Sequence, residues 1–306
     1  MHPKIAQLAK RGLLATGHYQ RKLAGDRFPG VAVLCYHGLR RDDAEAGSMA
    51  FEALHVRAAE FDAHCRLIRE TCDPIRLNDW IAENARLPPR PVLVTFDDGY
   101  GTVFSLAKPI LEEYGIPAVI FVTSRPAMER RRFWFDRVAI HLGESAVEDL
   151  KRCSYEEWRR RVNEVPEDSL ADDDPHAPLT LEELRVLARH PLFEIGGHTM
   201  IHPILARALA EVQRNEIFGN RNELETRIGV KIWAFAYPNG RPRLDYSEET
   251  LQLVQEAGFE MAFSSRSGFA LPSESRWERS RFLMLSGISE AELAHRLAYS
   301  WRRPVD

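Results

Sequence analysis

The 306-residue sequence has few cysteines, no long apolar run and no excess of basic residues. Its four cysteines, at positions 35, 65, 72 and 153, form no CxxC pair, so we expect reduced thiols in a reducing compartment rather than a disulfide framework or a zinc knuckle. The longest apolar runs, Val31–Tyr36 and Ala118–Val122, are far shorter than the roughly 20 residues of a membrane span. With 41 Lys+Arg against 45 Asp+Glu, the formal net charge of −4 argues against a general nucleic-acid-binding protein.

The first 25 residues lack acidic side chains and also lack the apolar stretch that is typical of a secretory signal. Apolar and small residues recur there at helical spacing, at Ile5, Leu8, Ala9, Gly12 and Leu13. This pattern predicts a short basic amphipathic helix in a segment of residues 1–28, followed by a main domain of residues 29–306. We expect the helix to pack on that domain, with contact between residues 1–25 and a membrane surface as the alternative. A cytoplasmic location is expected, at the inner membrane surface if the alternative holds.

Apolar strands alternate with amphipathic helices along most of the remaining chain. Buried strands are predicted at 31–36, 92–96, 118–122, 192–196, 231–236 and 261–264, and helices at 55–70, 103–114 with a break at Pro109, 209–228, 250–258 and 289–299. This alternation predicts an α/β fold with a parallel sheet, either open or closed into a barrel.

Residues 125–190 depart from the alternation and are predicted to form a helical insertion. Helices are expected near 134–143, 154–163 and 180–189, around an acidic, proline-containing segment at 164–178. Because runs of charge are usually solvated, we interpret that segment as a loop rather than a cation site. Phe133, Trp134 and Phe135 are candidates for an aromatic platform that binds a ligand, although packing in a local core is the interpretation that we favour.

Two polar motifs follow predicted strands, where ligands of parallel α/β folds bind. Asp97 and Asp98 follow the strand at 92–96; one carboxylate could bind a cation while the other handles a proton, but an Asp-Gly turn explains them equally well. His198 and His202 follow the strand at 192–196, and Pro203 favours a tight turn over a helix at that point. One Asp and two His would supply three ligands with an open fourth position, as in catalytic zinc sites, and this set suits cobalt and nickel as well.

Two further strand ends carry candidate residues. His37 follows the first strand, where an imidazole could donate a proton near neutral pH. Tyr237 and Asn239 follow the strand at 231–236 and are candidates for substrate contact, although a Pro-Asn-Gly turn needs no functional explanation.

From about Val31 to its C-terminus, the sequence resembles the polysaccharide deacetylase family of carbohydrate esterases. The resemblance rests on TFDDGY at 95–100, HTMIHP at 198–203 and FAYPNG at 235–240, and the order of the first two is its specific part. It implies an incomplete (β/α)7-type parallel barrel with a helical insertion. It also implies Asp97 as general base, and Asp98, His198 and His202 as ligands of a divalent metal, usually zinc.

The chain departs from the family pattern at the third motif. Many members carry an arginine there that pairs with the catalytic Asp, and this chain has Ala236 at that position. The sequence leaves open whether Arg241, Arg279 or Arg281 takes over this role.

The chain also departs from the family pattern at the motif that carries the general acid. Many members have a late Leu-x-His, whereas the late histidine of this chain, His295, lies in an ordinary helical pattern. The Tyr-His at 36–37 resembles the subgroup that acts on poly-N-acetylglucosamine-type exopolysaccharides, so His37 is predicted to be the acid.

The resemblance implies metal-dependent hydrolysis of acetamido groups of an N-acetylated sugar polymer or a lipid-linked glycan intermediate, with release of acetate. Asp97 would accept the water proton, the backbone N–H of Tyr100 would help to stabilise the oxyanion, and His37 would protonate the departing amine. Two alternatives stay open. One is an amidohydrolase of the same fold that acts on a small cyclic amide or ureide; the other is a degenerate carbohydrate-binding module.

Overall fold

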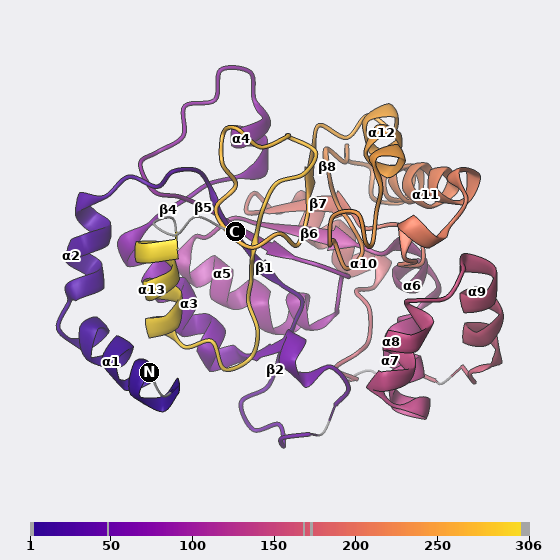
Figure 1. Cartoon of the computed structure of the whole chain (residues 1–306), viewed down its shortest axis with the longest axis horizontal. Coiled ribbons are helices and arrows are strands. Elements are labelled where there is room, and N and C mark those ends of the chain that lie inside the picture. The colour runs from indigo at the N-terminus through magenta and orange to yellow at the C-terminus, as the bar shows by residue number, and fades with distance from the viewer. Residues whose placement is uncertain (1–2, 48, 168, 172–173, 301–306) are drawn as a thin grey trace.

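The computed structural model describes residues 3–47, 49–167, 169–171 and 174–300. Its centre is a parallel sheet with the strand order β10-β1-β5-β6-β7-β8-β9, to which β4 adds beside β5 (Figure 1). The two edge strands of the sheet are β9 and β10. An isolated bridge joins Phe263 of β9 to Arg279, which lies shortly before β10. The sheet therefore curls into an incomplete parallel barrel, which confirms the predicted fold class. The strands are β1 (Ala32–Tyr36), β2 (Gly38–Arg40), β3 (His55–Arg57), β4 (Asp73–Pro74), β5 (Pro91–Phe96), β6 (Ala118–Val122), β7 (Phe193–Gly197), β8 (Ala234–Ala236), β9 (Met261–Phe263) and β10 (Phe282–Leu283).

The central strands are buried along their whole length because helices cover the sheet. Every residue of β1, β5 and β6 is buried, as expected for apolar strands of a parallel sheet. All six predicted strands are present, and the short strands β2, β3, β4 and β10 were not predicted. With only two or three residues each, these strands are too short to produce a periodic signal.

Most covering helices lie where the apolar periodicity predicts them. Those outside the N-terminal segment and the insertion are α3 (Ala58–Thr71), α4 (Leu77–Ile81), α5 (Lys108–Tyr114), α11 (Ala210–Ile228), α12 (Glu248–Glu256) and α13 (Glu290–Tyr299), with short 3-10 turns at Glu52–Leu54 and Leu205–Arg207. The predicted break at Pro109 takes the form of a π-helical turn, Val103–Ala107, that precedes α5. Pro109 is then the second residue of α5. An N–H at this position would have no partner within α5, so the proline costs no hydrogen bond of that helix.

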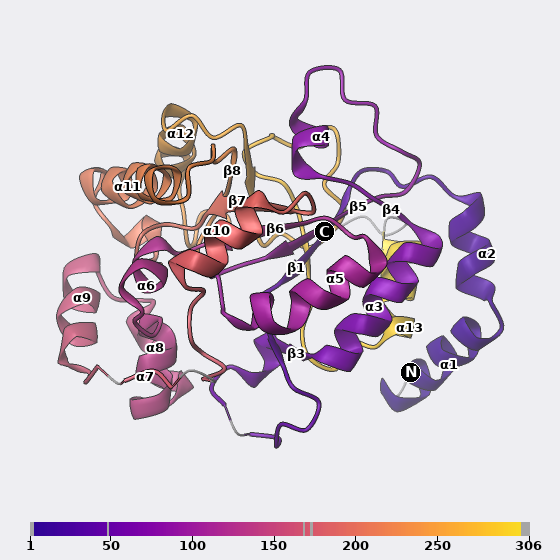
Figure 2. The same cartoon turned by 180° about the vertical axis from the view of Figure 1, so that it is seen from behind.

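The N-terminal segment forms two helices rather than one, α1 (Pro3–Ala15) and α2 (His18–Gly25). Gly17 separates them at a φ of 69°, a left-handed conformation that favours glycine. Both helices contact α13 at one end of the molecule (Figure 2). The predicted packing of this segment on the main domain is therefore confirmed.

The apolar face predicted for the first helix does not mediate that packing. Ile5 and Leu8 are 57% and 67% exposed, whereas Leu14 packs against the core and Lys10 pairs with Glu292 of α13. Contact of residues 1–25 with a membrane surface stays a prediction. Among the described residues, no helix combines the length and apolar character that crossing a bilayer requires.

The predicted insertion is helical and has a hydrophobic core of its own. Its helices are α6 (Ser124–Glu129), α7 (Trp134–Leu142), α8 (Glu144–Leu150), α9 (Tyr155–Glu164) and α10 (Leu181–Arg189), of which α6 and α8 were not predicted. Helices α7, α8 and α9 lie together at the end of the molecule opposite α1 and α2 (Figures 1 and 2). Aromatic residues of α7 and α9 pack there with Tyr100, which follows β5. The insertion is thus packed against the carboxyl end of a central strand.

The acidic segment 164–178 is described in part, and Asp168, Asp172 and Asp173 lie outside the described residues. Its three described acids each pair with an arginine: Glu164 with Arg160, Glu167 with Arg137 and Asp174 with Arg132. Ion pairing of these acids agrees with a loop rather than a cation site.

Candidate active site

A pocket of about 220 Å³ lies at the carboxyl ends of β1, β5 and β7. It brings together five of the residues that the sequence singled out from separate motifs: His37, Asp97, Asp98, His198 and His202. The rest of its lining is Cys35, Phe51, Leu54, Phe135, Lys151, Asn239, Ser265, Arg281 and Leu283. Strand pairing explains the convergence, because β1 and β5 run in register to their ends at Tyr36 and Phe96.

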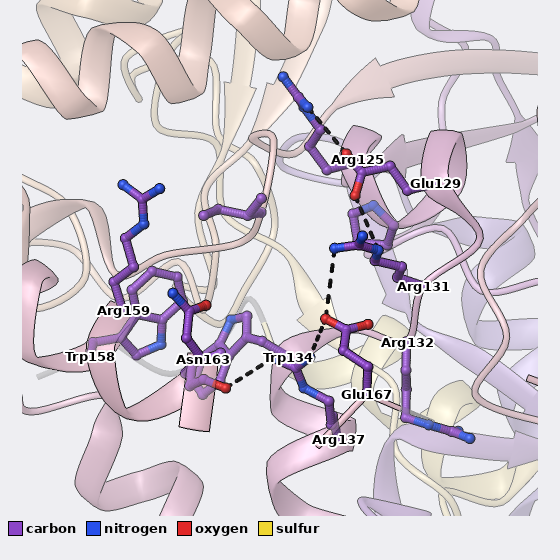
Figure 3. A pocket seen from close by; sticks show the side chains of 13 residues that line it. Arg125, Glu129, Arg131, Arg132, Trp134, Arg137, Trp158, Arg159, Asn163 and Glu167 are labelled. Atoms are coloured by element: carbon purple, nitrogen blue, oxygen red, sulfur yellow. Dashed lines mark hydrogen bonds and ion pairs between the residues drawn. The ribbon is translucent and has the colours of Figure 1, made fainter. Parts of the chain in front are cut away.

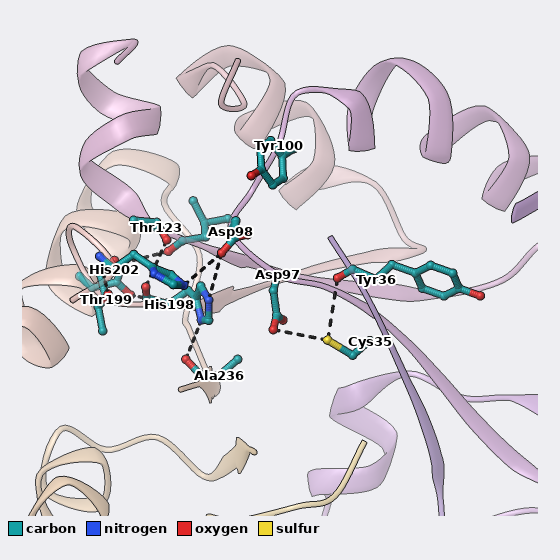
Figure 4. Close-up of polar contacts among 12 residues, drawn as sticks. Cys35, Tyr36, Asp97, Asp98, Tyr100, Thr123, His198, Thr199, His202 and Ala236 are labelled. Atoms are coloured by element: carbon teal, nitrogen blue, oxygen red, sulfur yellow. Dashed lines mark hydrogen bonds and ion pairs between the residues drawn. The ribbon is translucent and has the colours of Figure 1, made fainter. Parts of the chain in front are cut away.

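Three of these side chains form a buried group suited to a metal ion. One ligand atom each of Asp98, His198 and His202 lies within 4.8 Å of the others, and Asp98 Oδ1 is 3.3 Å from Nε2 of both histidines. Figure 4 shows Asp98 beside the two imidazoles. Ligands about 2.0–2.1 Å from a tetrahedral zinc are separated by roughly 3.3 Å. Among the described residues, Asp98 Oδ1 also has no hydrogen-bond partner although it is buried, so the donor set fits a divalent metal.

The protonation of this group agrees with that assignment. Nδ1 of His198 lies 2.7 Å from the carbonyl oxygen of Ala236. A carbonyl oxygen only accepts, so Nδ1 carries a proton, and in the neutral imidazole Nε2 is the nitrogen that can ligate a metal. Burial alone would raise the pKa of Asp98, but the neighbouring imidazoles of His198 and His202 hold it well below its ordinary value. Asp98 is therefore an ionised carboxylate, the form that binds a metal.

The chain carries unusual backbone conformations at this site. Asp98, Thr199, His202 and Asn239 have φ values of 70°, 65°, 60° and 55°, in the left-handed region that non-glycine residues seldom adopt. For the β-branched Thr199 this conformation is especially unfavourable. Strain of this kind persists only where surrounding contacts enforce it, and it concentrates at functional sites.

Two buried side chains of α11 hold the turn between the histidines, which is not helical, as predicted. Asn220 Oδ1 accepts a hydrogen bond from the N–H of His198 at 3.2 Å. Glu216 Oε2 accepts two backbone N–H groups from the middle of the turn, at 2.9 and 3.0 Å. A Cβ at Gly197 would lie 2.6 Å from Asn220 Oδ1, which explains the glycine before His198. Nothing in the sequence pointed to Asn220 or Glu216, because their partners are backbone groups distant in sequence.

Arg281 is the arginine that pairs with Asp97. Its Nη1 and Nη2 lie 2.7 and 2.8 Å from Oδ1 and Oδ2 of Asp97, a bidentate ion pair in which both side chains are buried. Arg241 instead pairs with Asp245 at 2.9 Å, and Arg279 donates to two backbone carbonyls. Burial opposes ionisation of Asp97, but the charge of Arg281 keeps its pKa below the ordinary value. Arg281 directly precedes the two-residue β10, which explains why sequence periodicity could not single it out.

The two candidate acids lie in different parts of the molecule. His37 is half-buried in the pocket lining, and its Nδ1 is buried without a hydrogen-bond partner. His295 lies on α13, where Nδ1 is 3.1 Å from the hydroxyl of Tyr19 in α2. The geometry therefore favours His37 as the group that could exchange a proton with a bound molecule.

The remaining predicted residues differ in their placement. Asn239 lines the pocket, and its Nδ2 is buried without a partner. Tyr237 does not line it: the side chain is buried in the core, its ring stacks on Tyr246 at 3.9 Å, and its hydroxyl donates to the carbonyl of Trp277. The expected contact of the Tyr237 side chain with substrate is thus corrected. Tyr100 packs in the core of the insertion and its hydroxyl donates to Asp136 at 2.8 Å, which leaves the role predicted for its backbone N–H a prediction.

The outer wall of the pocket comes from segments without a sequence motif. Phe51 precedes the 3-10 turn at Glu52–Leu54, and Phe135 and Lys151 belong to the insertion. The ring of Phe135 lies 5.0 Å from that of His202. Phe133 and Trp134, the other two candidates for an aromatic platform, pack in the core of the insertion.

Comparison with known proteins agrees with this architecture. A family model described as polysaccharide deacetylase matches residues 84–262, more than half of the chain. YxkH of Bacillus subtilis (strain 168), named after the same family, is 21% identical over 263 residues, which are 85% of this chain and 73% of YxkH.

Similar solved structures cover nearly the whole described fold. The Streptococcus pyogenes deacetylase PplD in complex with acetate is 20% identical, with a TM-score of 0.65 over 88% of this chain and 98% of PplD. IcaB from Ammonifex degensii is 20% identical, with a TM-score of 0.64 over 89% of this chain and 98% of IcaB. At such identities the solved structures establish a shared fold.

Proposed function

The chain belongs to the polysaccharide deacetylase family, and from this premise we propose that it is a metal-dependent N-deacetylase of an N-acetylated glycan, either a polymer or a lipid-linked intermediate. The observation that carries the proposal is the convergence of Asp97, Asp98, His37, His198 and His202 on one pocket. A bidentate partner for Asp97 in Arg281 gives further support.

Asp98, His198 and His202 would hold the metal ion. A bound divalent metal supplies Lewis-acid polarisation of a carbonyl group and lowers the pKa of water. Because three protein ligands leave a coordination position open, the set is of the catalytic rather than the structural kind.

Asp97 is proposed as the general base. Arg281 keeps its carboxylate ionised and fixed, so that either oxygen can accept the proton of a water molecule as that water attacks the acetamide carbon. His37 is proposed as the general acid, which gives a proton to the amine nitrogen as the C–N bond breaks. The products would be acetate and a sugar with a free amino group.

The size of the pocket supports recognition of one sugar unit near the metal ligands. Its volume of about 220 Å³ is below the range of roughly 300–1,000 Å³ that is usual for small-molecule clefts. One acetylated unit would enter, and the remainder of a glycan would extend over the outer surface. Phe135 and Leu283 offer apolar surface to the sugar, and Asn239 and Lys151 offer donors.

Acetate release is the direct test. Purified protein with zinc is incubated with N-acetylglucosamine oligomers of increasing length and, in parallel, with a cyclic ureide, with Asp97→Asn as the matched inactive control. The proposal expects acetate from the oligomers and no ring opening of the ureide. Ring opening without acetate would favour the small-amide hydrolase, and binding of oligomers without turnover would favour a carbohydrate-binding module. The cytoplasmic location stays a prediction.

A further inference from the structure

A second cavity, of about 280 Å³, lies in the insertion beside the metal-ligand turn and is lined by five arginines and two glutamates. We call it the arginine cleft. Its lining is Arg125, Pro126, Glu129, Arg131, Arg132, Trp134, Arg137, Trp158, Arg159, Val162, Asn163, Glu167 and Ile201. Figure 3 shows α9 on one side, with Trp158, Arg159 and Asn163, and Arg131 with the two glutamates on the other.

The carboxylates of the described residues do not fully neutralise the positive charge of the cleft. Arg159 is exposed and forms no ion pair with a described residue. Arg131 pairs with Glu129 at 3.4 Å and with Glu167 at 3.8 Å, and Arg137 also pairs with Glu167, whose side chain is 51% exposed. Arg132 does not add to the positive charge inside the cleft, because its guanidinium points away from the cleft in Figure 3 and pairs with Asp174.

The wall of the cleft also contains buried donors without acceptors. Nε1 of Trp158 and Nε of Arg137 have no hydrogen-bond partner in the part of the chain that the structure describes, although both side chains are more than nine-tenths buried. Buried donors of this kind are rare unless a water or a ligand accepts their hydrogen bonds. Guanidinium groups bind carboxylates and phosphates in a bidentate manner, and indole faces suit a sugar ring or a cation.

We propose that the arginine cleft binds an anionic group, a phosphate or a carboxylate carried by a glycan or glycan carrier, and that the Glu167 carboxylate occupies part of this anion site until the ligand displaces it. The cleft adjoins the candidate active site, because Ile201 lines it and Nε1 of Trp134 donates to the carbonyl of His202 at 2.9 Å. The glycan as carrier of the anion rests on the proposed function, whereas binding of an anion in the cleft is tested separately from the deacetylase reaction.

Isothermal titration calorimetry at constant ionic strength tests the proposal, with inorganic pyrophosphate and D-glucuronate as probes. The full-length wild type should bind one equivalent of at least one probe, and the preferred probe identifies the source of the anion as phosphate or carboxylate. Arg159→Ala should weaken binding about tenfold, the loss expected for one charge-assisted hydrogen bond. Glu167→Gln should tighten binding about threefold, because it removes the competing carboxylate.

The same segment provides matched controls. Arg160 and Glu164 pair with each other outside the arginine cleft, and their exposed fractions, 59% and 62%, resemble the 59% and 51% of Arg131 and Glu167. Arg160→Ala and Glu164→Gln should leave both affinities within about twofold of wild type, since exposed ion pairs contribute little. Equal effects of Glu167→Gln and Glu164→Gln would overturn the displacement mechanism.

Two further results would overturn the site itself. One is the absence of binding heat with both probes in a protein that circular dichroism shows to be folded. The other is binding that disappears after treatment with EDTA, since the anion would then sit on a metal ion at Asp98, His198 and His202 rather than in the arginine cleft.

Discussion

The sheet side and the insertion side of the candidate active site are built differently. On the sheet side, Asp97, Asp98 and His198 each come directly after a central strand, so strand register determines where they meet. On the insertion side, Phe135 and Lys151 belong to helical segments with a separate hydrophobic core. The proposed reactive groups therefore depend on the family fold, whereas the wall proposed to face the substrate depends on the packing of the insertion.

This difference separates chemistry from recognition. Substitutions on the sheet side should remove turnover, while substitutions of the insertion wall should change which substrates bind. The variants below test the sheet side and the residue of α11 that holds the turn between the two histidines, from the largest expected effect to the smallest.

Asp97→Asn should lower acetate release by about 10²–10⁴-fold, the range of a general base, while the metal content stays that of wild type. The substituted amide keeps the size of the side chain but cannot accept the proton. Acetate assays and elemental analysis on the same preparation check both parts. Retained turnover would remove Asp97 as the base.

His37→Ala should lower turnover by about 10²-fold, as expected for loss of a general acid, and His295→Ala should leave it near the wild-type value. His37 lines the pocket, whereas His295 contacts Tyr19 of α2. Turnover measured with saturating substrate compares the two variants. The reverse order would move the general acid to α13.

Arg281→Ala should lower the free energy of unfolding by about 3–5 kcal/mol, because it leaves the buried Asp97 carboxylate without its partner. Urea denaturation measures this loss. Arg276→Ala is the control, since Arg276 forms only a partly exposed ion pair with Glu260 at 3.8 Å and should cost less than about 1 kcal/mol.

The same variant should change the pH profile. Arg281 holds the pKa of Asp97 down, so its removal raises that pKa and moves the acidic limb of turnover to higher pH. An unmoved limb would mean that Asp97 is not the group that titrates there.

Glu216→Gln should change stability in a pH-dependent way. Burial raises the pKa of Glu216 to about 7, above the unfolded value of about 4.3. The folded state then binds the proton more tightly than the unfolded state. The contribution of Glu216 to the free energy of unfolding is therefore fully present below about pH 4.3 and is lost as the pH rises through 7. The loss is at most about 4 kcal/mol. Glu216→Gln should flatten this part of the profile in urea titrations at pH 5, 6, 7 and 8; an unchanged slope would contradict the assignment to Glu216.

The extent to which the sequence predicted the site follows the same division. Asp97, Asp98, His37, His198 and His202 were predictable because each lies within a short motif next to an apolar strand. Glu216 and Asn220 were not, since their roles arise from contacts with residues distant in sequence, and for the same reason Arg281 could be named only as one of three arginines that could pair with Asp97. Tyr237 shows the opposite failure, because a strand-end position alone does not reveal that its side chain turns into the core.

Metal content tests the central claim most directly, because it requires no knowledge of the substrate. Elemental analysis compares wild type with His202→Ala and with His190→Ala, where His190 lies beside Glu112 at 3.1 Å, away from the pocket. We predict one equivalent of a zinc-like metal in the wild type and in His190→Ala, and its loss in His202→Ala. No metal in the wild type after incubation with zinc, or full retention in His202→Ala, would contradict the proposed site.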